Sequence, residues 1–257
     1  IGMLSSSLPV QFFLPLVGWR VIFLFLALLT FVCILLIIIF IPKWQSKSIG
    51  NNHLDESKLI TVWKNPLFKS LVPMGFFSYG GLFAIQTLWA GPWMIRVSGY
   101  TPEKSAQGLF IIYLCMLISF LVWGYFVPKF SKNVNDAVKL LKIGAPLNLF
   151  VLVLIIYLGP KAGSIHWALF IVSSIFLSLT QPAVGMAFSL SNAGKALTSF
   201  NLLIFIGAFF IQWIIGLIID AGIKFNLSEI DSFKLAMTFV LITSLFSYIF
   251  FLRKNLK

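Results

Sequence analysis

The amino-acid sequence predicts an all-α, multi-span helical membrane protein, and three observations support this fold class. Of the 257 residues, 60% are hydrophobic and only 10% are charged, against about 25% charged residues in soluble domains. The mean hydropathy of the chain is +1.00. The apolar residues form long runs, and about 20 such residues in a helix cross a bilayer. The sequence shows none of the ten-residue alternations typical of a membrane β-barrel.

The first apolar run, Ile1–Val17, is interrupted by serines and prolines, and we interpret it as a whole or partial span. A short turn at Gly18–Arg20 follows. The next run, Val21–Ile41, is apolar throughout, which predicts a helix that faces lipid or apolar helices on every side. The chain begins with Ile1 and has no basic leader, so we expect it to be a portion of a longer protein.

The longest polar connection, Lys43–Lys69, follows these two runs. It is the best candidate for a boundary between structural halves. We therefore expect three parts: residues 1–42 as the end of a first half, residues 43–69 as a connecting loop, and residues 70–257 as a second half.

The stretch Ser70–Arg96 carries no charge between its first and last positions and is long enough to span a bilayer. Tyr79, Gln86 and Trp93 are seven residues apart, which places them on one face of a regular helix. A polar face on a spanning helix needs a neighbour other than lipid. We interpret this helix as the lining of a path through a transport protein.

Five more apolar runs complete a prediction of eight segments. Two of them carry polar residues on one face: Gln181 with Ser174 and Ser178, and Asn201 with Gln212, eleven positions apart. The five runs are Ser105–Val127, Ile143–Leu158, Trp167–Leu190, Ser199–Ile219 and Leu235–Leu252.

The net charge of +12 comes from Lys and Arg residues between the apolar runs. Most of them lie in alternate connections, above all in Lys43–Lys69, Pro128–Lys142 and the C-terminal tail. Because basic residues concentrate on the cytoplasmic side of membrane proteins, we expect the C-terminus in the cytoplasm. The same pattern explains the charge without nucleic acid, which we do not expect as a partner.

Enzyme motifs and cofactor sites are not expected. Cys33 and Cys115 lie inside apolar runs, so neither a disulfide nor a metal pair is indicated. The run Gly194–Ala196 lacks the remaining residues of a phosphate-binding loop. No charged residue lies at the centre of a span, which argues against a proton relay within this portion of the chain.

Four amides within the spans, Gln86, Gln181, Asn201 and Gln212, need hydrogen-bond partners away from lipid. They either line a water-filled cavity that binds a polar solute or hold neighbouring helices together. The tryptophans have two interpretations as well, stacking on a substrate or membership of an interfacial aromatic belt. The candidate substrate-binding residues are Gln86, Tyr79, Trp89, Tyr113, Gln181, Asn201 and Gln212.

Four runs of sequence are informative in combination: Leu16–Arg20 before an apolar span, Leu88–Trp93, Ala193–Ala196, and Phe200–Asp220. Together they resemble bacterial transporters of the major facilitator superfamily, over helices five to twelve of twelve. The chain departs from the loop signature of that family, Gly-x-x-x-Asp-Arg. Starting from Gly124, Pro128 and Lys129 stand where Asp and Arg would be.

The resemblance implies a complete C-terminal six-helix bundle and the last two helices of an N-terminal bundle. It also implies a secondary active transporter in the inner (plasma) membrane that moves a small solute by alternating access. A monomer in the lipid bilayer is expected, and a coupling ion is left open. The alternatives are a non-transporting membrane sensor or a truncated remnant and, less favoured, a membrane-embedded enzyme.

Overall fold

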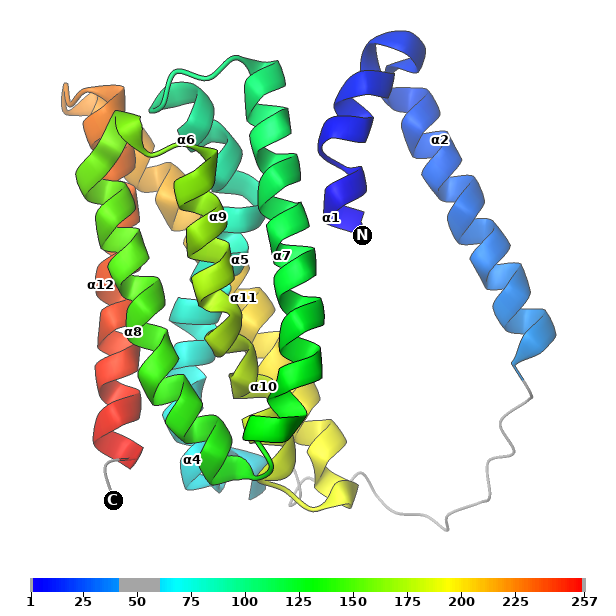
Figure 1. Ribbon diagram of the computed structural model, residues 1–257, viewed down its shortest axis with the longest axis vertical. Coiled ribbons are helices and arrows are strands. Elements are labelled where there is room, and N and C mark those ends of the chain that lie inside the picture. Colours follow the sequence, from blue (N-terminus) through cyan, green and yellow to red (C-terminus); the bar gives the residue numbers. More distant parts are fainter. Residues whose placement is uncertain (1, 42–60, 256–257) are drawn as a thin grey trace.

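The computed structural model describes residues 2–41 and 61–255, and Figure 1 shows these parts as helices joined by short connections. Seven helices in the described ranges are long and apolar enough to cross a membrane. The predicted all-α, multi-span fold class is thus confirmed. Of the loop expected over 43–69, residues 43–60 lie outside the described part of the chain. Residues 61–64 are helical, and the next helix begins at Pro66.

The N-terminal part contains α1 (Gly2–Ser5) and α2 (Leu8–Phe40). Gly18 interrupts α2 with φ 73° and ψ 162°, a conformation that only glycine adopts readily, and the chain reverses its direction there (Figure 1). The expected turn at Gly18–Arg20 is therefore present.

The described part holds seven candidate spans rather than the eight segments expected. The missing one is the first run, Ile1–Val17. A turn at residues 6–7 separates α1 from α2, and the regular helix between Leu8 and Gly18 is about half the length of a span. The serines in this run give the backbone competing hydrogen bonds: Ser6 and Ser7 donate to the carbonyls of Met3 and Leu4.

Six spans between residues 66 and 255 form a bundle (Figure 1). The helix at Pro66–Arg96 is composite, because two π-helical segments interrupt it. Its parts, in order, are α4 (Pro66–Pro73), η1 (Met74–Tyr79), α5 (Gly80–Ala84), η2 (Ile85–Trp89) and α6 (Ala90–Arg96). We call Pro66–Arg96 the composite helix.

The remaining helices of the bundle are mostly regular. The exceptions are the 3₁₀ segments η3 and η4, of which η4 interrupts the fifth of the seven spans. In order, the elements are α7 (Pro102–Phe130), α8 (Val134–Leu158), η3 (Gly159–Lys161), α9 (Ser164–Ser173), η4 (Ser174–Leu179), α10 (Thr180–Met186), α11 (Leu190–Lys224) and α12 (Glu229–Asn255).

Helix α11 packs against α12 and the composite helix, while α7 and α8 both pack against α9. Large side chains fill the space between these helices, and Trp93, Trp167 and Phe200 are fully buried. The composite helix and α11 approach until their backbones touch. A Cβ atom on Gly80 would lie 2.8 Å from the backbone nitrogen of Ala208, and one on Gly207 would overlap the carbonyl oxygen of Phe76. Only glycine allows this approach.

Candidate functional site

The first candidate pair joins α10 to α11. The Gln181 amide nitrogen donates to the Asn201 side-chain oxygen over 2.9 Å, and both side chains lie near the bundle surface. Gln181 stands in the first turn of α10, directly after the 3₁₀ segment η4. The expected neighbour Ser178 does not join the pair, because its hydroxyl donates to the carbonyl of Ile175 in its own helix.

The second candidate pair joins α11 to the composite helix. The Gln212 amide nitrogen donates to the Thr87 hydroxyl over 2.8 Å, and the Trp89 indole N–H donates to the Gln212 backbone carbonyl over 3.3 Å. Thr87 and Trp89 both belong to the π segment η2. Thr87 is exposed, so this contact lies at the edge of the bundle and not inside it.

An aromatic group lies between the two polar pairs. Asn201, Phe205 and Gln212 fall within about 40° of one another around α11, at about 1.5 Å rise per residue. The Phe205 ring lies 5.9 Å from the Phe83 ring, which lies 5.4 Å from the ring of Tyr79, a residue that is itself buried at 8% exposed. We call this face the α11 strip, and define it by Gln181, Asn201, Phe205, Phe83, Tyr79, Gln212, Thr87 and Trp89.

Along α11 the strip extends about 16 Å from Asn201 to Gln212, because these residues are eleven positions apart and each residue adds about 1.5 Å. One polar end offers the amides of Gln181 and Asn201, and the other offers Gln212 with Thr87. A primary amide carries two N–H donors and a carbonyl acceptor, so one interhelical bond leaves donors and acceptors for another molecule. Such a surface can bind a small amphipathic solute.

Gln86 and Tyr113 lie behind this strip, inside the bundle. Their exposed fractions are 5% and 9%, and the Tyr113 hydroxyl donates to the Gln86 backbone carbonyl over 2.8 Å. This bond ties α7 to the composite helix. Trp93, which shares the seven-residue spacing with Gln86, is fully buried, and its indole N–H donates to the Ala162 carbonyl over 3.1 Å.

Sequence reasoning missed two polar residues. Thr87 was passed over because regular helical spacing favoured Gln86, its neighbour, as the polar member of the face. Asn148 was also missed, although it is an amide within the apolar run Ile143–Leu158. It is 7% exposed, and its amide donates to the Phe170 carbonyl over 2.9 Å and to the Ser173 hydroxyl over 3.1 Å. An amide within a span was the signal that could have identified Asn148.

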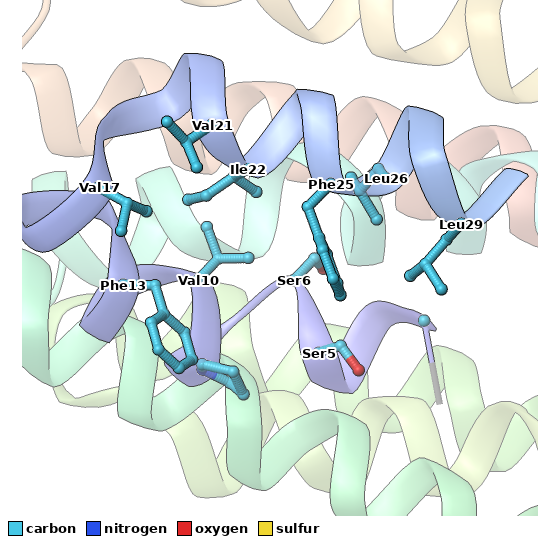
Figure 2. Close-up of a pocket in the computed structure, with 12 residues that line it drawn as sticks. Ser5, Ser6, Val10, Phe13, Val17, Val21, Ile22, Phe25, Leu26 and Leu29 are labelled. Atoms are coloured by element: carbon cyan, nitrogen blue, oxygen red, sulfur yellow. The ribbon is translucent and has the colours of Figure 1, made fainter. Parts of the chain in front are cut away.

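A cavity of about 710 Å³ lies apart from the strip, between α1 and the two arms of α2 (Figure 2). Phe13 and Val10 on one arm face Val21 and Phe25 on the other. Ser5 and Ser6 supply the polar side chains of its lining, and none of the candidate amides reaches it.

Within residues 2–41 and 61–255, no group of three or more His, Cys, Asp or Glu side chains could hold a metal ion. The polar groups of the α11 strip are the amides of Gln181, Asn201 and Gln212, the hydroxyls of Thr87 and Tyr79, and the indole N–H of Trp89.

Comparison with known proteins gives one match. A family model described as Major Facilitator Superfamily matches residues 1–212. Searches of curated proteins and of solved structures find no match.

Proposed function

The chain belongs to the Major Facilitator Superfamily and is a multi-pass membrane transport protein, and from this premise we propose that it is a secondary active transporter of a small polar solute. Transport proceeds by alternating access, in which a fixed central site opens to each side of the membrane in turn. The protein acts as a monomer in the inner membrane, with its C-terminus in the cytoplasm.

The observation that carries the proposal is the α11 strip. Two interhelical polar pairs, Gln181 with Asn201 and Gln212 with Thr87, lie at either end of an aromatic group. Polar side chains in a spanning helix are energetically unfavourable in contact with lipid, so they favour contact with water. The pairs lie at the bundle surface, where a solute can reach them, and their spare donors and acceptors provide hydrogen bonds for it.

The predicted site residues divide into two roles in this proposal. Gln181, Asn201 and Gln212 contact the solute, and Trp89 provides a ring face beside it. Tyr79 is only 8% exposed, so its ring supports Phe83 from inside the bundle. Gln86 and Tyr113 hold the composite helix against α7, because their contact is buried. Thr87 joins the first group.

Labelling of single cysteines tests whether the strip is wet without knowledge of the substrate. In a background with Cys33→Ser and Cys115→Ser, Asn201→Cys is expected to react with a membrane-impermeant thiol reagent. Trp213→Cys is the matched control, because Trp213 is 58% exposed on the same helix but about 120° away from Asn201. Equal reaction rates of the two variants would contradict the proposal that the strip lines the solute pathway.

Transport assays test the solute contacts. Uptake into vesicles is measured with a panel of labelled amino acids, sugars, organic anions and drugs. For the solute transported, Gln181→Ala and Gln212→Ala are each expected to lower uptake about tenfold, the value of one hydrogen bond of about 1.4 kcal/mol. Trp213→Ala is the control. Unchanged uptake in both glutamine variants would contradict their role, and no uptake of any solute would favour a sensor.

A further inference from the structure

A cavity of about 520 Å³ lies at the end of the bundle where α4 and α8 begin and α12 ends. In Figure 1 this is the end of the bundle that carries the C-terminus. Three lysines line the cavity: Lys139 and Lys142 from α8, and Lys254 from α12. Among the described residues, its lining includes no Asp or Glu. The cavity therefore has a net positive charge and attracts an anion.

The middle lysine is held in place by other polar groups. The Lys142 ammonium donates to the Asn255 backbone carbonyl, and the Lys142 carbonyl accepts a 2.8 Å hydrogen bond from the Tyr248 hydroxyl. The Asn255 amide in turn donates to the Ser70 hydroxyl over 3.0 Å. These contacts join α8, α12 and α4 around the cavity. Lys139 and Lys254 are exposed and can turn towards a ligand.

The nearest carboxylate along α8, that of Asp136, has another role. It accepts a hydrogen bond from the backbone nitrogen of Lys132 over 3.2 Å, and Asp136 does not line the cavity. It caps the turn before α8, so within residues 2–41 and 61–255 no carboxylate of the lining neutralises the lysines.

The cavity wall is not wholly polar, since Leu67 and Val138 also line it. Beyond the cavity, α8 and α12 expose large apolar side chains such as Phe150 and Phe246, which are 64% and 63% exposed. An ion free in water would use only the lysines. A phospholipid matches both parts, because its phosphate fits the lysines and its acyl chains fit the apolar surface.

We propose that this basic cavity binds the headgroup of an anionic phospholipid. The lysines contact the phosphate, Leu67 and Val138 contact the glycerol region, and the acyl chains lie against α8 and α12. Basic pockets between spanning helices favour such headgroups, since each lysine near the membrane surface contributes about 1 kcal/mol of attraction to anionic lipid.

Native mass spectrometry of the purified protein titrated with phosphatidylglycerol tests this proposal. The wild-type protein is expected to retain phosphatidylglycerol in preference to phosphatidylcholine. The variant Lys139→Gln/Lys142→Gln/Lys254→Gln is expected to lose about a hundredfold in affinity, because each of the three lysines contributes about fivefold. The matched control is Lys129→Gln/Lys132→Gln/Lys195→Gln, which removes three charges at the same end of the bundle but outside the cavity. It is expected to stay within about twofold of the wild type.

A second variant keeps the charges. Leu67→Trp fills the cavity and is also expected to lower retention of phosphatidylglycerol. It provides an independent test if the triple variant does not fold. Four results would overturn the proposal: equal losses in the two triple variants, wild-type retention in Leu67→Trp, equal binding of phosphatidylcholine, or displacement of the lipid by millimolar inorganic phosphate. The last result would assign the cavity to a free anion.

Discussion

Helix α2 is more apolar than the composite helix, yet it is much less buried. Of the seven candidate spans, α2 is the most apolar and has no buried residue, whereas the composite helix is the least apolar and has 61% of an 18-residue stretch buried. In water the opposite relation would hold, because burial there follows apolarity. In a bilayer lipid is as apolar as leucine, so an apolar surface does not by itself drive helices together.

The composite helix is buried because its side chains allow close contact and hydrogen bonding. Gly80 meets the backbone of α11, and the Ser78 and Ser247 hydroxyls lie 2.7 Å apart between the composite helix and α12. Helix α2 presents large side chains such as Phe23 and Ile38, which are 65% and 70% exposed. Small and polar residues thus mark the packed helices of this protein, and uniformly apolar ones mark the surface.

The largest expected effect compares one tryptophan from each region. Trp93→Ala removes a fully buried ring and its hydrogen bond to Ala162, and should lower the free energy of unfolding by about 3–5 kcal/mol. Trp19→Ala removes a ring that is 58% exposed, and should change it by less than about 0.5 kcal/mol. Unfolding in mixed micelles measures the free energy of unfolding of both variants. Equal losses in the two variants would contradict the difference between the two helices.

A smaller effect is expected where the composite helix crosses α11. Gly207→Ala places a methyl group against the Phe76 carbonyl and should cost about 1–3 kcal/mol. Gly194→Ala, on the same helix with open space around it, should cost nothing. Thermal unfolding in detergent distinguishes them. A Gly207→Ala variant as stable as Gly194→Ala would show that the close approach is not required.

Next in size is the buried amide that joins α8 to α9. Asn148→Ala removes its bonds to Phe170 and Ser173, and should cost about 0.6–1.7 kcal/mol, the range for polar contacts between spanning helices. Thr30→Val in α2 is the counterpart, since the Thr30 hydroxyl bonds only within its helix, to Leu26, among the described contacts. It should be neutral in the same unfolding measurement. A larger loss for Thr30→Val would reverse the comparison.

The smallest effect is expected at the surface ion pair. The Arg96 guanidinium lies 3.4 Å from the Glu229 carboxylate, with both side chains largely in solvent. Glu229→Gln should therefore cost less than about 0.5 kcal/mol, and the cost should shrink further as salt is added. Unfolding at low and high ionic strength checks this, and a loss that is independent of salt would contradict it.

Hydropathy and turn residues were enough to predict the helical class, the approximate spans of the bundle and the chain reversal at Gly18. They wrongly predicted a separate span for the first run. Its length is that of a span, but a turn at Ser6 and Ser7, stabilised by their hydrogen bonds to nearby carbonyls, interrupts it. The division into domains at 43–69 stays a prediction, since most of that loop lies outside the described residues.

The candidate site was less accessible to sequence reasoning. Its residue types could be predicted, since Gln181, Asn201 and Gln212 stand out as amides in apolar runs. Their partners could not, because a hydrogen bond such as Gln212 to Thr87 depends on how two distant helices pack. Tyr79, Gln86 and Trp93 are all buried, at 8%, 5% and 0% exposed, whereas Thr87 in the second π segment is exposed.

The contact between Gly80 and Gly207 also limits how the composite helix can move. With backbone against backbone, no side chain is present there to change its rotamer and make room. Sliding by about one turn along α11 would bring Leu203 or Ile211, four residues away on the same face, to the position of Gly207, where a Cβ atom overlaps the Phe76 carbonyl. The close approach of the two backbones at this crossing therefore opposes a shift of the composite helix along α11.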